Sequence, residues 1–211
     1  MDIKILLLSL AVGSEYKRII NPCIKTIENY ANKHNLSFKL ADECYKGKRP
    51  PAWYKIKAIK KYLNDYDWIV WLDSDIVITN NNFNIFEFIN KFKEKKVIIG
   101  KDFNNVNSGV MFWKSCKSNL ELLDEIWSKK YCINHYWFEQ KAIIDMIEAG
   151  NKDFHILDES DSWIINASTK NFKNDSWLIH FAGFKNNKLK NKIEKYINLK
   201  NRDYEQKKFF I

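Results

Sequence analysis

Apolar runs and helix-spaced stretches alternate along the first third of the chain. Residues 3–10, 36–41 and 68–72 are short stretches in which hydrophobic side chains predominate, and they predict buried strands. Between them, residues 15–34 and 53–63 place apolar side chains at intervals of three and four, as in amphipathic helices. Strands separated by helices of this length favour a parallel sheet with helices on both faces. The pattern therefore predicts an α/β fold.

The rest of the chain is more mixed. The expected helices cover residues 85–92, 120–127 and 137–147, and the expected strands cover residues 97–99, 105–113, 154–157 and 177–181. Residues 188–211 are rich in lysine and predict a C-terminal helical tail. No internal repeat or long linker interrupts the pattern, so we expect a single domain over residues 1–211.

Composition agrees with one domain and limits the partners. The chain has 211 residues, 45% of them hydrophobic, which is enough for a sizeable core. Its net charge of +9 comes mostly from lysines spread along the sequence. Such a charge suits nucleic acid, an anionic membrane or a phosphate-bearing small molecule. Because no arginine-rich tract or aromatic RNA-binding signature is present, we expect no nucleic-acid partner.

The cysteines and the N-terminus bear on the compartment. None of the four cysteines forms a C-x-x-C pair, and we expect reduced thiols at Cys23, Cys44, Cys116 and Cys132. The apolar residues 5–12 are few and follow Asp2 and a single lysine, so they favour a strand over a signal peptide. No apolar run approaches the roughly 20 residues of a membrane span. The sequence therefore predicts a cytoplasmic protein and leaves its oligomeric state open.

Two aspartates interrupt an otherwise apolar region. Asp73, Ser74 and Asp75 separate the apolar residues 68–72 from residues 76–78. Neighbouring carboxylates repel, and they are costly to bury unless they are paired or bind a cation. For a D-x-D motif alone, a polar turn after a strand is the simpler interpretation. In an open α/β sheet, however, ligands bind beyond the carboxyl ends of the strands, which is where these aspartates are expected. Their position favours a metal-bound nucleotide.

His180 is the candidate for a third metal ligand. It follows the short apolar run of residues 177–179, so it should emerge at a strand end. A lone histidine there is more often structural, but Mn²⁺ accepts imidazole as well as carboxylate oxygen, whereas Mg²⁺ prefers oxygen. Lys185 follows five residues later, and its charge would be useful beside a diphosphate.

Five sequence blocks resemble those of glycosyltransferase family 34. They are AWYKIKAIKKYL, WIVWLDSDIVIT, NSGVMFWKSCKSNLELLDEIW, FEQKAIIDMI and IHFAGFK, which occur in the family's order within a stretch that spans roughly two thirds of the chain. The family includes plant xyloglucan α-1,6-xylosyltransferases, plant galactomannan α-1,6-galactosyltransferases and fungal mannan galactosyltransferases. The resemblance implies a GT-A fold with a mixed, mainly parallel sheet flanked by helices. It also implies metal-dependent, retaining transfer from a nucleotide sugar.

The resemblance implies roles for residues around the metal and the nucleotide. Asp75 would hold Mn²⁺ (or Mg²⁺) most directly, Asp73 would share it and reach the ribose, and His180 would be the third ligand. The residues implied in binding the UDP-sugar are Asp73, Ser74, Lys55, Ser108, Gly109, Gly183 and Lys185.

The same resemblance points to catalytic residues. Asn107 begins the N-S-G loop that lines the sugar pocket in the family, and Gln140 matches a residue near the anomeric carbon, opposite the leaving group. Together with Lys185, these residues are the expected catalytic set. A retaining route, in which the leaving phosphate takes the acceptor proton, needs no strong protein base.

An inverting route is the alternative, and it needs a carboxylate base. The available candidates are Glu139, Asp158 and Asp161. Glu139 is also a departure from the family, which often has Asp before the Gln, and Phe184 replaces the Cys of the family's HF-x-G-C-K block. These departures affect the identity of donor and acceptor more than the metal site.

The sequence thus predicts a soluble glycosyltransferase that uses Mn²⁺ and UDP-glucose, UDP-galactose or UDP-xylose. Its acceptor would be a hydroxyl of a saccharide or glycoprotein. One alternative is a glycogenin-like protein glucosyltransferase. The other is a non-catalytic basic binding module.

Overall fold

The computed structural model describes residues 3–103 and 105–208, with side chains up to residue 197. Within this part, the strands form a main sheet in the order β2-β1-β3-β6-β5-β7 and a smaller sheet in the order β4-β9-β8. The main-sheet strands are β1 (Ile5–Ser9), β2 (Ser37–Leu40), β3 (Trp68–Leu72), β5 (Val97–Lys101), β6 (Val106–Lys114) and β7 (Phe154–Ile156). The second sheet contains β4 (Ile76–Ile78), β8 (Ala167–Ser168) and β9 (Leu178–His180).

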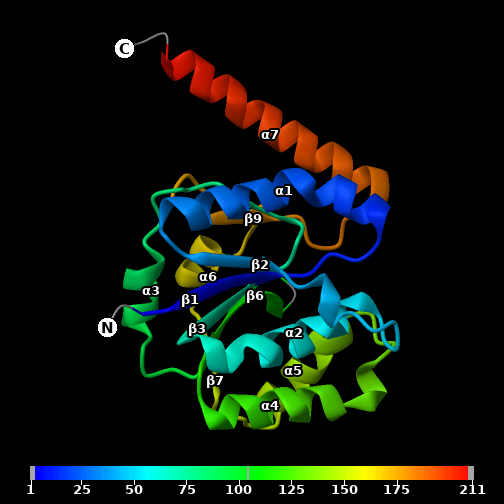
Figure 1. Cartoon of the computed structure of the whole chain (residues 1–211). Helices are drawn as coiled ribbons and strands as arrows, with labels where there is room; N and C mark the ends of the chain where they lie inside the picture. Colours follow the sequence, from blue (N-terminus) through cyan, green and yellow to red (C-terminus); the bar gives the residue numbers. More distant parts are fainter. Residues whose placement is uncertain (1–2, 104, 209–211) are drawn as a thin grey trace.

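Helices cover both faces of the main sheet (Figure 1). One side carries α1 (Ser14–Lys33), α3 (Ile85–Lys91), α6 (Glu159–Ile165) and α7 (Asn186–Lys208), together with the second sheet. The other side carries α2 (Tyr54–Tyr62), α4 (Lys117–Ser128) and α5 (Phe138–Glu148). Short 3₁₀ turns lie at η1 (Asp42–Cys44), η2 (Pro51–Trp53), η3 (Leu63–Asp65) and η4 (Lys130–Cys132).

Strand β1 shows why the sequence forms this layered arrangement. Ile5 and Leu7 point into the core beneath α1, whereas Leu6 and Leu8 point into the core beneath α2 and α4. Alternate side chains of a strand face opposite sides of the sheet. Because both sides are covered, the strand is apolar from Ile5 to Leu8, as in the parallel sheets of α/β proteins, and the buried hydroxyl of Ser9 donates to the carbonyl of Leu72. The buried strand predicted from the sequence is confirmed.

The strand directions bring two predicted motifs together. Strand β1 is parallel to β2 and β3, as expected, but β6 runs antiparallel to both β3 and β5, so the sheet is mixed. The start of β6 therefore lies beside the carboxyl end of β3, and Leu72 pairs with Val110. One residue further, the N–H of Asp73 donates to the carbonyl of Gly109 at 2.8 Å. The N-S-G residues thus meet the aspartates.

The second sheet brings His180 to the same place. Strands β4 and β9 are antiparallel, with Ile76 opposite His180, and the N–H of Phe181 donates to the carbonyl of Asp75. Strand β8 is parallel to β9, with Ser168 opposite His180. The sequence predicted neither β8 nor the preceding helix α6.

Several other expectations can be compared with the structure. Helix α7 begins at Asn186, two residues before the predicted tail, and residues 209–211 of that tail lie outside the described residues, as do Met1 and Asp2. All four cysteines are free thiols, as predicted. None of the helices in the described ranges combines the length and the apolar character needed to cross a bilayer.

Candidate functional site

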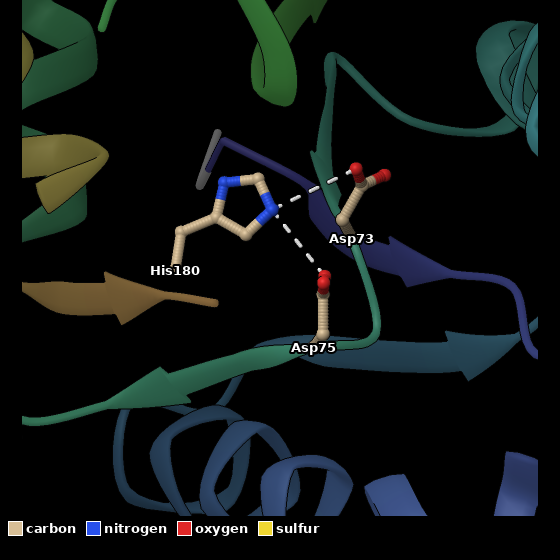
Figure 2. A group of neighbouring side chains, drawn as sticks. All are labelled: Asp73, Asp75 and His180. Carbon is tan, nitrogen blue, oxygen red and sulfur yellow. Dashed lines mark ion pairs between the residues drawn. The ribbon is translucent and has the colours of Figure 1, made fainter. Parts of the chain in front are cut away.

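Three predicted metal ligands converge between the two sheets. Asp73 and Asp75 lie on the turn that joins β3 to β4, and His180 ends β9 (Figure 2). The Nε2 atom of His180 is 3.3 Å from Asp75 Oδ1 and 3.9 Å from Asp73 Oδ2. One ligand atom from each residue lies within 4.8 Å of the other two. Residues more than 100 positions apart thus form one cluster.

The chemistry of this cluster suits a divalent cation. Two carboxylates and an imidazole match the preferences of Mn²⁺, which accepts both oxygen and imidazole nitrogen. Burial raises the pKa of Asp75, but the charge of His180 and the hydrogen bond to it outweigh burial and lower that pKa below its usual value. Burial likewise lowers the pKa of His180, but Asp75 outweighs it and the net pKa is raised. Both pKa shifts indicate that the negative charges of Asp75 and Asp73 favour a positive charge at the position of His180.

Lys55 lies beneath Asp73 and is buried. Its Nζ is 2.9 Å from Asp73 Oδ1 and 2.9 Å from Glu139 Oε1. Burial lowers the pKa of Lys55, but these two carboxylates outweigh burial and raise it. The indole N–H of Trp71 donates to the same Asp73 oxygen at 2.7 Å. With Oδ1 held by these two donors, Oδ2 is the Asp73 oxygen that faces His180.

Ser108 connects this lysine to helix α5. Its hydroxyl donates to Glu139 Oε1 at 3.0 Å, and its backbone N–H donates to Gln140 Oε1 at 3.0 Å. Burial raises the pKa of Glu139 despite the nearby Lys55. The second carboxylate oxygen of Glu139 is buried without a hydrogen-bond partner in the described part of the chain. Glu139 therefore faces the interior, where an acceptor hydroxyl has no access to it.

Asn107 and Gly109 have internal contacts. The side-chain oxygen of Asn107 accepts from the N–H of Gly109 at 2.8 Å, and its nitrogen donates to Asp102. A Cβ atom on Gly109 would lie 2.1 Å from the Cε1 atom of His180. Gly109, which the resemblance implied in binding the UDP-sugar, thus makes room for the imidazole.

A pocket of about 310 Å³ opens beside the aspartates. It is lined by Leu10, Val12, Tyr16, Pro51, Ala52, Lys55, Trp71, Asp73, Ser74 and Asp75. The hydroxyls of Tyr16 and Ser74 lie 3.2 Å apart at its wall. A larger pocket, of about 640 Å³, lies between η1, α2 and α4 and contains none of the predicted site residues.

Other predicted residues lie outside this cluster. Lys185 is exposed just before α7, and Gly183 adopts a left-handed conformation (φ 81°) in the turn after β9. Neither residue belongs to the lining of the pocket. Asp158 accepts a hydrogen bond from the N–H of Asp161 and caps α6, and Asp161 pairs with Lys91. These two carboxylates therefore have structural contacts of their own.

Some residues of the site were not predicted from the sequence. Trp71 precedes Asp73 by two positions, and side chains with this spacing on one strand share a face, so the pattern could have indicated it. Tyr16 and Asn166 gave no such signal. Asn166 precedes β8, and its side-chain Oδ1 lies 3.0 Å from His180 Nδ1.

Known proteins resemble the chain in sequence and in fold. Residues 2–94, which include both aspartates, match the model of the galactosyl transferase GMA12/MNN10 family, glycosyltransferase family 34. An uncharacterized alpha-1,2-galactosyltransferase of Schizosaccharomyces pombe is 28% identical over 61% of this chain and 46% of the relative. An alpha-1,2-galactosyltransferase of the same organism is 23% identical over 82% and 58%. The chain thus spans about half the length of these curated relatives.

A solved structure shares the fold of this chain over almost its whole length. It is described as a glycosyltransferase involved in the glycosylation of the major capsid of PBCV-1, and it superposes with a TM-score of 0.73 at 19% identity. The match covers 91% of this chain and 99% of that one. Over residues 2–94 the sequence thus resembles glycosyltransferase family 34, the galactosyl transferase GMA12/MNN10 family, and the chain as a whole has the GT-A fold.

Proposed function

We propose that this chain transfers a sugar from a UDP-sugar to a hydroxyl group of a saccharide or glycoconjugate, with a divalent cation and with retention of configuration. The observation that carries the proposal is the convergence of Asp73, Asp75 and His180 beside a ligand-sized pocket. The volume of the pocket, about 310 Å³, lies within the range typical of small-molecule sites.

The proposed cation is Mn²⁺. Asp73 Oδ2, Asp75 Oδ1 and His180 Nε2 would hold it, because these are the atoms that face one another. When bound, such a cation neutralises the diphosphate and stabilises UDP as the leaving group. Lys185, on the exposed turn after β9, would supply further positive charge through its long side chain, and Gly183 would shape that turn.

The pocket suits a nucleoside. Leu10, Val12 and Tyr16 provide apolar and aromatic surface for a planar base. Ser74 and Asp73, which line the same pocket, provide polar groups for the ribose. Lys55 acts indirectly in this proposal, because its charge is already shared by Asp73 and Glu139.

The residues near the N-S-G segment support retention. Gln140 carries an amide, which is no base, and Glu139 is tied to Lys55 and Ser108. In a retaining route, the acceptor hydroxyl attacks from the side of the departing phosphate, and that phosphate takes its proton. Gln140 would then stabilise the positive charge of the sugar ring from the other face. UDP-galactose is an α-glycoside, so the α-linkage named for the relatives also agrees with retention.

The test measures UDP release from UDP-galactose, UDP-glucose and UDP-xylose, with Mn²⁺ or with EDTA. We expect Mn²⁺-dependent release with one donor, with galactose the first candidate because of the relatives' names. The Asp75→Ala variant should lose the release and nucleotide binding while remaining folded. Asp65→Ala, which changes an exposed aspartate on η3, is the matched control and should behave as wild type.

Each contrary result has a distinct meaning. A product with β configuration, identified by NMR, would contradict retention. Added hexose on the protein itself, seen by intact mass, would favour the glycogenin-like alternative. Absence of both UDP release and nucleotide binding, for UDP- and GDP-sugars alike, would overturn the proposal in favour of a binding module.

A further inference from the structure

A chain of hydrogen-bonded side chains runs from Asp102 to His180. Asn107 Nδ2 donates to Asp102 Oδ2 at 2.8 Å, and Asn166 Nδ2 donates to Asn107 Oδ1 at 2.9 Å. Asn166 Oδ1 then lies 3.0 Å from His180 Nδ1. Asn107, Asn166 and His180 are all buried, with exposed fractions of 6%, 3% and 6%. Buried polar groups of this kind are held by their partners instead of by water.

The direction of every bond in this chain is determined. The N–H of Gly109 can only donate, and it donates to Asn107 Oδ1 at 2.8 Å, whereas an ionised Asp102 can only accept. These two partners fix which end of the Asn107 amide is oxygen. Asn166 must then turn its nitrogen toward Asn107 and its oxygen toward His180. Because that oxygen can only accept, Nδ1 of His180 must carry a proton.

The other ring nitrogen faces the aspartates. Nε2 lies 3.3 Å from Asp75 Oδ1, on the side of the ring away from Asn166. The ring also packs against Gly109, where a Cβ atom would lie 2.1 Å from Cε1 and 2.6 Å from Nδ1. A metal-bound histidine needs a lone pair on one nitrogen, and the hydrogen bond of the other nitrogen decides which one it is.

We propose that Asn166 is a positioning residue for the metal site: oriented by Asn107 and Asp102, it holds the proton of His180 on Nδ1 and keeps Nε2 as the ligand atom. The role in metal binding rests on the proposed function, whereas the position of the proton is a property of the protein alone. The proposal also changes the expected role of Asn107. Its side chain is hydrogen-bonded to Asp102, Gly109 and Asn166, so its role is to orient Asn166.

The first test is the position of the proton in the metal-free protein. With ¹⁵N-labelled histidine at alkaline pH, where the imidazole is neutral, long-range ¹H–¹⁵N correlation spectra distinguish the two tautomers. We expect Nδ1–H for His180 in the wild type and a shift toward Nε2–H in Asn166→Ala. Asn166→Asp keeps the accepting oxygen and should keep Nδ1–H. A wild-type His180 in the Nε2–H form would overturn the proposal, and that measurement needs no variant to fold.

The second test is the affinity for Mn²⁺, measured from the EPR signal of the free ion. We expect Asn166→Ala to bind about 10–100-fold more weakly, the usual effect of removing a partner of a metal-bound histidine. Asn119→Ala is the control. Asn119 lies on α4 and is also fully buried, but its side chain donates to the carbonyls of Lys96 and Lys114 and not to a site residue. Its Mn²⁺ affinity should stay unchanged.

The outcomes separate this proposal from the proposed function. If folded Asn166→Ala bound Mn²⁺ as tightly as the wild type, the positioning role would be wrong. If Asn119→Ala weakened binding to the same degree, the effect would be one of general stability, and the role would again be wrong. If the wild type bound no Mn²⁺, the metal in the proposed function would fail, and the tautomer would still decide whether Asn166 holds the Nδ1 proton.

Discussion

The imidazole of His180 packs against the backbone of Gly109, and this contact leaves no room for a side chain. A Cβ atom at position 109 would lie 2.1 Å and 2.6 Å from two atoms of the ring and 2.9 Å from Asn107 Oδ1. We expect Gly109→Ala to displace the ring, weaken Mn²⁺ binding, and lower the free energy of unfolding by about 1–3 kcal/mol, as overpacking does. Mn²⁺ titration and urea denaturation measure the two effects.

Gly100→Ala provides the matched control for this substitution. Gly100 is also a strand glycine, but the nearest atom to its added Cβ would be the hydroxyl oxygen of Ser162 at 3.4 Å. We expect a much smaller loss of stability and unchanged Mn²⁺ affinity. Equal effects of the two substitutions would show that the contact between Gly109 and His180 has no special importance.

The buried charge of Lys55 leads to a second prediction for a single residue. Replacing it in Lys55→Met leaves Asp73 and Glu139 without their shared cation, so we expect a loss of about 3–5 kcal/mol in the free energy of unfolding. Because the pKa of Lys55 is raised on folding, its contribution is present at neutral pH and is lost only as the pH rises above the usual lysine pKa of about 10.4.

Urea denaturation at neutral pH checks this prediction against an exposed lysine. Lys60→Met removes a partly exposed ion pair with Asp124 and should cost less than about 1 kcal/mol. In the double variant Lys55→Met with Glu139→Gln, one of the two unpaired charges is gone, so part of the stability should return. A similar cost for Lys55→Met and Lys60→Met would contradict the buried network.

At the residue scale, the sequence indicated the metal-ligand candidates but only part of their surroundings. Asp73, Asp75 and His180 could be identified because each follows an apolar strand, and strand ends meet at one edge of a sheet. The partner of Lys55 could not be identified, because Glu139 lies on a helix 84 residues away and any of many carboxylates could have met it. Asn166 had no signal at all, since asparagine is frequent throughout this chain.

At the scale of elements, the short helix α6 depends on its first residue. The side chain of Asp158 accepts from the N–H of Asp161, and this hydrogen bond lowers the pKa of Asp158. We expect Asp158→Ala to lower the melting temperature slightly and to leave UDP release unchanged, because the residue caps a helix and is no catalytic base. The cap acts above the usual aspartate pKa of about 3.9 and is lost as the pH falls below it.

Melting curves across the acid range, together with the UDP-release assay, check this prediction. The difference in melting temperature between wild type and Asp158→Ala should shrink as the pH falls and Asp158 becomes protonated. Loss of UDP release in a folded Asp158→Ala protein would contradict the capping role and would support an inverting route.

The elements missed by the sequence show no readable hydrophobic period. Strand β8 has only two residues, and helix α6, with the sequence ESDSWII, has its apolar residues together at its end instead of at helical spacing. The direction of β6 was hidden for a different reason. All residues of β6 except the last are buried. A strand buried on both faces has the same kind of sequence in either direction, so the sequence does not indicate its direction.

At the scale of the whole molecule, the proposed cation site would link cation binding to folding. A ligand that binds only the folded state stabilises it by about 2.7 kcal/mol at 100 times its dissociation constant. For a chain of this size we therefore expect saturating Mn²⁺ to raise the melting temperature by about 5–10 °C. Differential scanning calorimetry with Mn²⁺ and with EDTA measures the shift. Asp75→Ala should show none, and an equal shift in that variant would place the cation elsewhere.

The layered architecture as a whole could be predicted, because alternating strand and helix patterns leave few arrangements for a buried sheet. The second sheet could not be predicted, because β4, β8 and β9 are short and β4 pairs with β9 across about 100 residues of chain. It nevertheless supplies His180, so the part of the fold that the pattern failed to predict is the part that completes the candidate site.

The position of the cluster between two sheets has a mechanical consequence. Asp73 follows a strand of the main sheet, His180 ends a strand of the smaller one, and Asp75 lies on the crossover between them. An ion held by all three residues would join the main sheet to the smaller sheet. Sliding of one sheet against the other would then require release of the ion, so this motion could be no faster than the dissociation of the ion.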